Sequence, residues 1–521
     1  MMHSPARRRA TRRAVVLLLV AVVAVAACGP KAKPATHPAA AATAGSFVPA
    51  AGSLSAELDR IFGAPAFDRM HWAVMVQSLT SGAVLFERNA SKLMMPASNM
   101  KVVTLAAAAE RLGWDYHYKT TLSTSAAVDP SGTLGGDLVV TGTGDPTING
   151  RGGSPTRVFE AWADKLREAG IQRIAGRIVA DAGTFDPEGL GAGWAWDYLG
   201  EDYAAPVSAL QYNEDVAELV VRAGAVAGPP ASVEVRPIES GLVVDNRVTT
   251  QASGAADIEV RRLPRSSRVS ISGTIPVGSK DVVLTVSVDD PALYFARVLR
   301  ATLIGRGIFV SGEAVHVDGA AETDTASGSS RVLLTHESPP LAELARVLMK
   351  VSQNLYAETL LKTLGGQAGE GSARRGKQAV GETLRSWGIP PEQYILADGS
   401  GLSRYNYLCA EMLVRVLRQM YRDPRHREAF QATLPIGGRD GGTLARRFKG
   451  TRAEDNVRAK TGSIANVRAL SGYVTTLDGE PLVFSILANG FTQPQSTIDA
   501  AIDLAVERLA NVSRGAQPGV K

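Results

Sequence analysis

The chain has 521 residues, of which 45% are hydrophobic and 21% are charged, a composition typical of a globular protein with room for two or three domains. Its formal net charge is +5. Five arginines near the start account for that excess: Arg7, Arg8, Arg9, Arg12 and Arg13. The rest of the chain is close to neutral, which argues against a nucleic-acid partner, because nucleic acids select basic surfaces.

The early arginines precede an apolar run over residues 14–27. A basic region followed by a short apolar region is typical of an export signal, and this run is too short to cross a bilayer comfortably. The run ends in V-A-A-C-G, which resembles a bacterial lipobox with Cys28 as the lipidated residue. The sequence therefore predicts a signal peptide over 1–28 and an exported protein, anchored by a lipid on Cys28 in the periplasm or cell envelope. A plain cleavage site is the alternative, and Arg12-Arg13 leaves twin-arginine export open.

The next elements follow in chain order. Residues 29–50 are rich in alanine and proline and predict a flexible tether. Two strands are expected over 72–77 and 83–88, joined by a turn. A helix over 102–112 follows, and Gly113 stands where a helix would end.

Short alternating segments separated by glycine and aspartate turns predict a β-rich insert over 122–330. The parts on either side, 51–121 and 331–512, have a different character, and helical periodicity returns in the second of them. Further helices are expected over 157–169, 291–304, 340–350, 355–364 and 496–510, and further strands over 470–476 and 482–488.

Ser98 allows two interpretations. Serine is a preferred N-cap, because its oxygen accepts a hydrogen bond from a free N–H at the start of a helix. Lys101, three residues later, lies on the same helical face, so it could instead act as the base of a nucleophilic Ser98. The local sequence does not decide between a cap and a nucleophile.

Two further short motifs bear on that choice: Ser352-Gln-Asn354 before a helical run, and Lys460-Thr-Gly-Ser463 before a strand. Patterns of the S-x-x-K, S-x-N and K-T-G kind form the catalytic set of penicillin-binding proteins and class A β-lactamases. Taken singly, Ser352 could be a second helix cap and Lys460 a strand-edge lysine. The ordered trio favours catalysis.

Each member of the trio has an expected role. Lys101 takes the proton of Ser98, provided that burial and nearby Lys460 lower its pKa. Ser352 relays a proton to the leaving amine, and Asn354 holds Lys101 and the substrate amide. Substrate-binding residues come from the third motif: Lys460 and Thr461 receive a carboxylate, Gly462 completes the motif, and the backbone N–H of Ser463 joins that of Ser98 in an oxyanion hole.

Longer segments of the sequence also resemble one family of proteins that carries these motifs. The chain resembles the D-alanyl-D-alanine carboxypeptidase/endopeptidase family, the class C low-molecular-mass penicillin-binding proteins, over nearly everything from Leu54 to Ala510. The segments that carry the resemblance are 136–146, 181–186, 203–210, 336–343, 398–404 and 458–464. It implies an α+β fold with a serine β-lactamase/transpeptidase-like domain, an antiparallel sheet flanked by helices, that is split by the large β-rich insert.

The resemblance also implies that Asp181 reaches the active site from the insert and binds the amino group of a diamino acid; a turn-forming aspartate is the alternative. The sequence departs from the family at Gln353, where aspartate is usual, and in the segment 436–444, which carries an extra glycine and Arg439. Neither departure touches the trio.

The implied function is hydrolysis of D-Ala-D-Ala bonds in peptidoglycan stem peptides through an acyl-enzyme, with β-lactams as inhibitors and with no metal or organic cofactor. A homodimer is possible. One alternative is a β-lactamase, which the long separation of Ser98 from Ser352 disfavours. Another is a non-catalytic wall-binding or β-lactam-sensing lipoprotein, which would not need both lysines.

Overall fold

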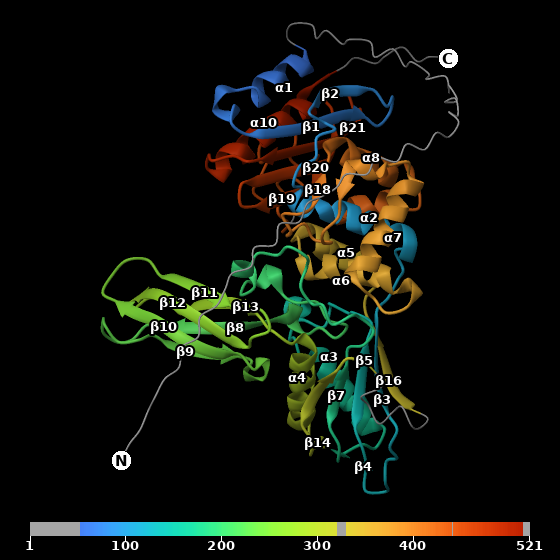
Figure 1. Cartoon of the computed structure of the whole chain (residues 1–521), viewed down its shortest axis with the longest axis vertical. Helices are drawn as coiled ribbons and strands as arrows, with labels where there is room; N and C mark the ends of the chain where they lie inside the picture. The colour runs from blue at the N-terminus through green and yellow to red at the C-terminus, as the bar shows by residue number, and fades with distance from the viewer. Residues whose placement is uncertain (1–52, 320–329, 440, 514–521) are drawn as a thin grey trace, which may run out of the picture. The chain divides into compact units, whose positions relative to one another are not determined.

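The computed structural model describes residues 53–319, 330–439 and 441–513 (Figure 1). The predicted signal peptide, Cys28 and the tether lie outside these residues. Within the described ranges, no helix combines the length and apolar character needed to span a membrane.

A five-stranded antiparallel sheet, in the order β19-β20-β21-β1-β2, joins the two ends of the described chain. Its strands are β1 (His71–Ser78), β2 (Val84–Arg88), β19 (Arg458–Ile464), β20 (Val467–Thr475) and β21 (Pro481–Asn489). Trp72 and Val74 on β1 pack in the same cluster as α1 (Leu54–Phe62) and α10 (Gln495–Asn511), whereas Ala73 joins the opposite cluster. β1 is thus buried on both faces, which explains why its sequence is nearly continuously apolar.

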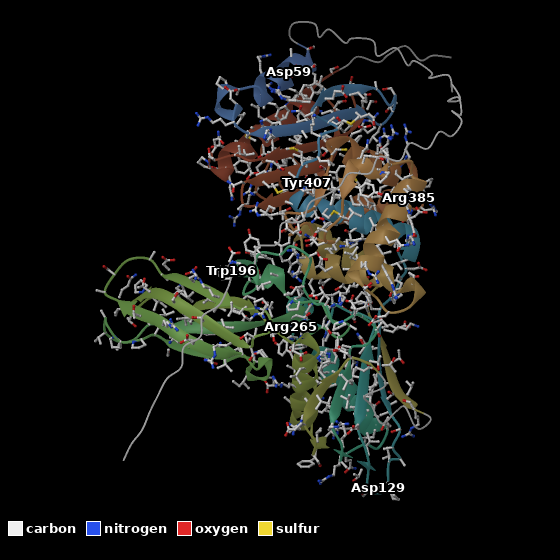
Figure 2. The ribbon with its side chains drawn as sticks, in the orientation of Figure 1. Asp59, Asp129, Trp196, Arg265, Arg385 and Tyr407 are labelled. Atoms are coloured by element: carbon white, nitrogen blue, oxygen red, sulfur yellow. The ribbon has the colours of Figure 1, made fainter. Side chains whose placement is uncertain are left out.

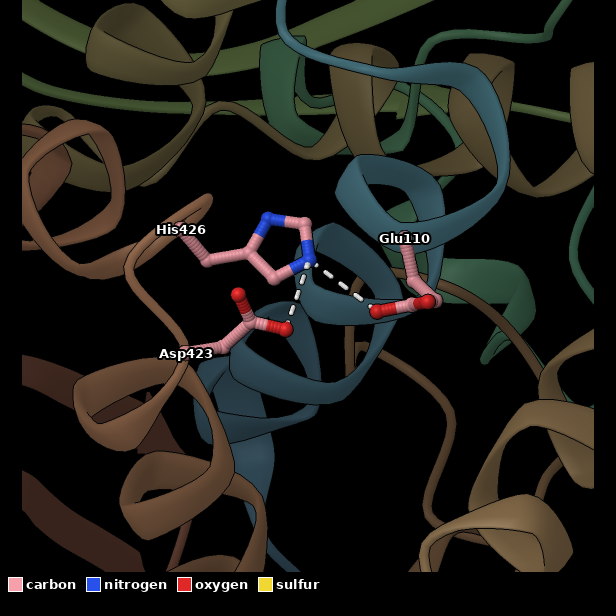
Figure 3. A group of neighbouring side chains, drawn as sticks. All are labelled: Glu110, Asp423 and His426. Atoms are coloured by element: carbon pink, nitrogen blue, oxygen red, sulfur yellow. Dashed lines mark hydrogen bonds and ion pairs between the residues drawn. The ribbon is translucent and has the colours of Figure 1, made fainter.

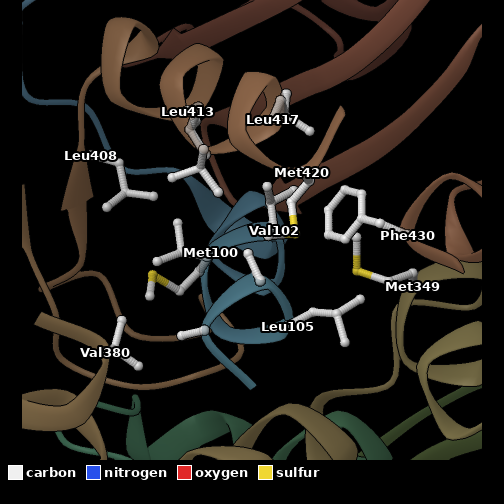
Figure 4. Close-up of a cluster of buried hydrophobic side chains, with 14 of the residues drawn as sticks. Met100, Val102, Leu105, Met349, Val380, Leu408, Leu413, Leu417, Met420 and Phe430 are labelled. Atoms are coloured by element: carbon white, nitrogen blue, oxygen red, sulfur yellow. The ribbon is translucent and has the colours of Figure 1, made fainter. Parts of the chain in front are cut away.

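The other face of the sheet carries a group of helices around α2 (Met100–Leu112). These are α5 (Leu341–Lys350), α6 (Asn354–Gly365), α7 (Ala373–Ser386), α8 (Ala410–Arg422) and α9 (Arg427–Thr433), with the short strands β17 (Tyr394–Ile395) and β18 (Tyr407–Leu408). Every residue of α2 from Met100 to Ala109 is buried, and Figure 4 shows Met100, Val102 and Leu105 among side chains of the neighbouring helices. A helix that is covered on all sides is held in place by packing, and so are the residues at its start.

The insert contains a second five-stranded sheet, in the order β15-β7-β5-β3-β16, and three smaller three-stranded sheets. Its elements are β3 (Lys119–Thr124), β4 (Thr133–Leu134), β5 (Leu138–Gly142), α3 (Arg157–Glu168), β6 (Arg173–Ile174), β7 (Ile178–Asp181), β8 (Val216–Arg222), β9 (Ser232–Arg236), β10 (Val243–Gln251), β11 (Asp257–Arg262), β12 (Arg268–Pro276), β13 (Val282–Ser287), α4 (Pro291–Gly305), β14 (Phe309–Val310), β15 (Ala314–Val317) and β16 (Arg331–Glu337). A single core that includes Phe159, Trp162 and Phe295 unites α3 and α4 with these sheets.

β3 and β16 pair with each other, so the insert sheet extends a few residues beyond the expected limits of 122–330 at both ends. The insert also contacts α6 directly. Lys362, which is 3% exposed, forms an ion pair of 2.6 Å with Asp186, and Gln211 donates to Thr359 at 2.8 Å. These contacts with the insert therefore hold α6, the helix that begins with Asn354, in place.

Candidate active site

Ser98 lies in a tight turn that leads into α2. Residues Ala97–Asn99 form a short 3-10 helix, and Ala97 has a φ of 46°, which is unusual for a residue with a side chain. The N-cap position of α2 belongs to Asn99, and no side chain caps the helix there. The capping interpretation of Ser98 is therefore wrong: its Oγ accepts a hydrogen bond of 3.0 Å from Lys101 Nζ.

Lys101 has three hydrogen-bond partners. Besides Ser98 Oγ, its Nζ lies 2.6 Å from Asn354 Oδ1 and 2.8 Å from the carbonyl oxygen of Ser400. Asn354 Nδ2 donates to the carbonyl of Tyr203 at 2.8 Å, which fixes the amide so that its oxygen faces Lys101. A neutral amine has two N–H groups, and the two obligate acceptors take both. The lone pair of neutral Lys101 then faces the Ser98 hydroxyl, as a general base requires.

Burial makes that neutral form accessible. Lys101 is fully buried, and desolvation lowers its pKa from 10.5 to about 7, against the opposing effect of the carboxylates of Asp398 and Glu358. Burial, and then the charge of Lys101, hold the pKa of Lys460 well below its ordinary value. Because the charge of Lys101 opposes a charge on Lys460, a doubly protonated state is disfavoured, and one of the two amines can serve as a base near neutral pH.

Ser352 is the second hydroxyl of the site. Its φ of 66° turns the chain sharply before α6, and its Oγ accepts a hydrogen bond of 2.8 Å from Lys460 Nζ. Gln353 caps α6 by accepting from Leu355 N at 3.0 Å, so Ser352 is not the cap. Because Ser352 Oγ accepts from Lys460, its own proton is free for donation toward the cavity.

Two glycines allow the three motifs to approach one another. A Cβ on Gly462 would lie 2.7 Å from the carbonyl oxygen of Pro96 and 2.8 Å from Asn99 Nδ2. A Cβ on Gly401, where φ is +87°, would lie 1.8 Å from the carbonyl oxygen of Ala97. Any side chain at either position would push the Ser98 turn away from β19 or from the Ser400 carbonyl.

The site opens into a cavity of about 540 Å³. Its lining contains Ser98, Ser352, Asn354, Thr461 and Ser463, together with Tyr198, Tyr203, Leu402, Thr443, Ile464, Ala465 and Gln495. Lys101 and Lys460 are both 0% exposed and lie beneath the surface of the cavity. Tyr198 and Tyr203 come from the insert, and Trp196 on the same segment, labelled in Figure 2, is 58% exposed.

Sequence reasoning assigned no role to Tyr198, Tyr203, Leu402 or Thr443. Signals were present, since the segments 203–210 and 398–404 carry the family resemblance, but nothing in them says that they reach the cavity. Thr443 Oγ1 forms a hydrogen bond of 2.8 Å with Thr461 Oγ1, so the unusual segment 436–444 contacts the third motif. Arg439, in the same segment, forms an exposed ion pair with Asp455 instead.

The hydroxyl group of Ser463 is held by a neighbouring arginine. Arg468, which is 7% exposed, donates to Ser463 Oγ at 2.5 Å. Because Ser463 Oγ accepts this bond, its hydroxyl proton can point to a ligand in the cavity. Arg468 also forms an ion pair of 3.5 Å with Asp499, so its guanidinium is held in place next to the expected oxyanion-hole residue.

Asp181 is not brought to this cavity in the described part of the chain. It lies at the end of β7, 9% exposed, and its carboxylate accepts hydrogen bonds from Gly183 N at 3.0 Å and from Thr141 Oγ1 at 3.4 Å. These contacts suit the turn-forming alternative, and substrate contact by Asp181 stays a prediction. Cys409 is free and buried at the start of α8.

Glu110, Asp423 and His426 gather at the far end of α2 in an arrangement that resembles a metal site (Figure 3). Trp114 Nε1 donates to His426 Nδ1 at 3.1 Å, so the ring proton resides on Nε2, which faces Glu110 Oε2 at 3.0 Å. Arg425 pairs with both carboxylates. A protonated Nε2 has no lone pair for a metal, so the donor set fits a hydrogen-bonded ion cluster that joins α2 to α9.

The family model, the related sequences and the solved structure that match this chain all indicate one family of proteins. The family model for D-Ala-D-Ala carboxypeptidase 3 (S13) matches residues 54–511. The D-alanyl-D-alanine carboxypeptidase of Actinomadura sp. strain R39 is 33% identical over 88% of this chain and 84% of its own length. D-alanyl-D-alanine carboxypeptidase DacB of Haemophilus influenzae is 27% identical over 83% and 90%. The crystal structure of penicillin binding protein 4 from Haemophilus influenzae superimposes with a TM-score of 0.76 at 25% identity, covering 87% of this chain and 97% of that one.

Proposed function

The chain belongs to the D-Ala-D-Ala carboxypeptidase 3 (S13) family, and on that premise we propose that Ser98 is the nucleophile of a serine D-Ala-D-Ala carboxypeptidase acting on peptidoglycan stem peptides. The observation that carries the assignment is the set of contacts at Lys101, whose two obligate acceptors, Asn354 and Ser400, direct its lone pair at Ser98. A pure binding protein gains nothing from such a base, so this geometry disfavours the non-catalytic alternative.

In the acylation step, Ser98 Oγ bonds to the carbonyl carbon of the penultimate D-alanine while its proton passes to Lys101. The C–N bond then breaks, and the leaving amine takes the proton of the Ser352 hydroxyl, whose oxygen is held by Lys460. Ser352 regains a proton from Lys101, which is thereby neutral again. Water attacks the resulting ester, Lys101 again accepts the proton, and Ser98 regains its hydroxyl. Every proton removed is returned, and each step of the proposed cycle is assigned to a residue of this chain.

The edge strand β19 suits binding of an extended peptide. Among the described residues its sheet partner is β20, and its other edge is bonded at Arg458 and Ala459 to Ile436 and Pro435. The part of that edge beyond Ala459 can hydrogen-bond to a peptide lying alongside. A terminal carboxylate would meet the hydroxyls of Thr461 and Ser463, with Arg468 behind them and Gly462 keeping the strand close to the Ser98 turn. Backbone N–H groups of Ser98 and Ser463 would stabilise the oxyanion.

The same acylation serves two outcomes. A substrate whose leaving group is free D-alanine gives carboxypeptidase action, and one whose leaving amine belongs to a second stem peptide gives endopeptidase action. The open cavity of about 540 Å³ is large enough for either. A β-lactam presents a strained amide to the same serine and is expected to acylate it.

We further propose that the protein is exported and held by a lipid on Cys28. The support is the basic and apolar opening of the chain and the V-A-A-C-G sequence. A substrate in the cell wall is consistent with that location. Self-association of the chain stays a prediction.

The decisive experiment is intact-protein mass spectrometry after incubation with a fluorescent penicillin. The wild-type protein should gain one covalent adduct, and Ser98→Ala should gain none. Ser386→Ala, which alters a serine at the end of α7 away from the cavity lining, is the matched control and should label normally. A folded wild-type protein that forms no adduct would overturn the acyl-enzyme mechanism.

A further inference from the structure

A buried carboxylate lies beneath Lys101 and has no part in the mechanism above. Glu358 stands one turn after Asn354 on α6 and is 4% exposed. Its carboxylate accepts hydrogen bonds from Gly399 N at 2.9 and 3.1 Å and from Ser400 N at 2.8 Å. Among the described residues it has no ion-pair partner within 4.0 Å.

A second buried carboxylate continues the same pattern. Asp398, which is 1% exposed, accepts from Gly401 N at 2.7 Å and from Ser403 N at 2.6 Å. Glu358 and Asp398 together therefore hold the N–H groups of three consecutive peptides, Gly399 to Gly401. A stretch of backbone clamped at each N–H has little freedom to rotate its carbonyls.

The carbonyls of this stretch face α2. The Gly399 carbonyl accepts from Thr104 Oγ1 at 2.7 Å, and the Ser400 carbonyl accepts from Lys101 Nζ at 2.8 Å. Each carbonyl shares its peptide plane with the next N–H, so a carboxylate that holds the N–H aims the carbonyl on the opposite side. Asp398, through Gly401 N, thereby aims the Ser400 carbonyl at Lys101. Glu358, through Ser400 N, aims the preceding Gly399 carbonyl at Thr104.

We propose that Glu358 and Asp398 are positioning residues for Lys101: Asp398 fixes the Ser400 carbonyl that orients the amine, Glu358 fixes the peptide before it through Ser400 N, and both carboxylates supply negative charge beneath the amine. The inference rests on the proposed function, because it concerns the base of that reaction. Two desolvated carboxylates close together are costly, and a hydrogen-bonded turn alone does not require them. Their position under the catalytic amine gives them a use.

Charged groups on several neighbouring elements surround the Lys101 amine. Burial, followed by Asp398, raises the pKa of Glu358 to about 7. Both carboxylates raise the pKa of Lys101 against the larger effect of burial. Burial and then the charge of Lys101 lower the pKa of Lys460 on β19, and Lys377 on α7 donates to the carbonyl of Ala397 at 3.2 Å. Removing the Glu358 charge should therefore lower the pKa of Lys101 and make the neutral base available at lower pH.

The test is the second-order rate constant for acylation by a fluorescent penicillin from pH 5 to 9, measured for Glu358→Gln on protein whose folding is verified by circular dichroism. We expect a plateau about tenfold lower and an acidic limb shifted down by about half a pH unit or more. Glu358→Asp keeps the charge but has a shorter reach, so it should lower the plateau while leaving the limb near its wild-type position. Glu343→Gln, which removes an exposed carboxylate from α5, should change neither.

The remaining outcomes distinguish a positioning role of Glu358 from a structural role and from failure of the proposed function. A folded Glu358→Gln protein whose limb does not move would overturn the proposal, whatever its plateau, because a merely structural role predicts that result. If Glu358→Gln does not fold, Asp398→Asn is expected to shift the limb in the same direction, and an unmoved limb there would overturn it equally. If the wild-type protein is never acylated, the proposed function fails instead.

Discussion

Asn354→Asp is the most informative single substitution, because it keeps the shape of the side chain and changes only its chemistry. The new carboxylate would still accept from Lys101 Nζ, now 2.6 Å away, but as an anion it would favour the charged ammonium. An opposite charge at such a distance shifts a pKa by about 1–3 units. Starting from a pKa of about 7, the neutral fraction of Lys101 at pH 7 would fall about fivefold for one unit and about five-hundredfold for three.

The sign of the effect gives a second prediction for the same variant. Since Lys101 must be neutral to act as the base, its function is present above its pKa and lost below it. Raising that pKa moves the acidic limb of acylation to higher pH, so the rate of Asn354→Asp should recover steeply between pH 7 and pH 9. The rate of adduct formation with a fluorescent penicillin checks this, with Asn511→Asp at the exposed end of α10 as a charge-matched control.

A folded Asn354→Asp protein that acylates at the wild-type rate at pH 7 would refute the assignment of Lys101 as base. A loss that does not recover at high pH would point instead to the second contact of this residue. There the new oxygen would face the Tyr203 carbonyl, which the amide nitrogen now meets at 2.8 Å. Circular dichroism and the unfolding temperature separate that structural effect from the electrostatic one.

Two further substitutions test the assembly of the site. Gly462→Ala should lower acylation at least tenfold and destabilise the fold by about 1–3 kcal/mol, because its Cβ would overlap the Pro96 carbonyl; an unchanged rate would show that the Ser98 turn tolerates displacement. Gln353→Asp restores the usual family residue and should change acylation by less than about threefold, since aspartate also caps helices and only the 2.9 Å bond to Glu214 is lost. A tenfold loss would give Gln353 a role in the chemistry.

The sequence predicted the catalytic motifs because their chemistry is carried by side chains at fixed spacing. It also located α2 to α6, α10 and four of the five strands of the catalytic sheet, whereas the third motif, which was expected just before a strand, lies within β19. Its ambiguity about Ser98 could not be resolved locally, since capping and nucleophilic serines share the same neighbours. The structure resolves it through Asn354 and Ser400, which lie hundreds of positions away.

What the sequence could not supply were contacts made by the backbone. The carbonyls of Ser400 and Tyr203 orient Lys101 and Asn354, yet any residue type offers a carbonyl, so composition and spacing carry no signal for them. The expected role of Asp181 has no local signal either, and its contact with substrate stays a prediction. A polar residue in a family-like segment attracts a functional role, although its position at the end of β7 depends on tertiary packing that no local pattern encodes.

The order of strands in the catalytic sheet has a consequence for synthesis. β1, made early, pairs along its whole length with β21, from His71 against Asn489 to Ser78 against Leu482. A ribosome-bound chain that already contains Ser98 and Lys101 therefore lacks both the strand that anchors their sheet and the lysine that faces Ser352. Such long-range pairing delays formation of the sheet until nearly all residues are available. Penicillin labelling would consequently report completed folding, and a chain truncated before β19 should remain unlabelled although its nucleophile is intact.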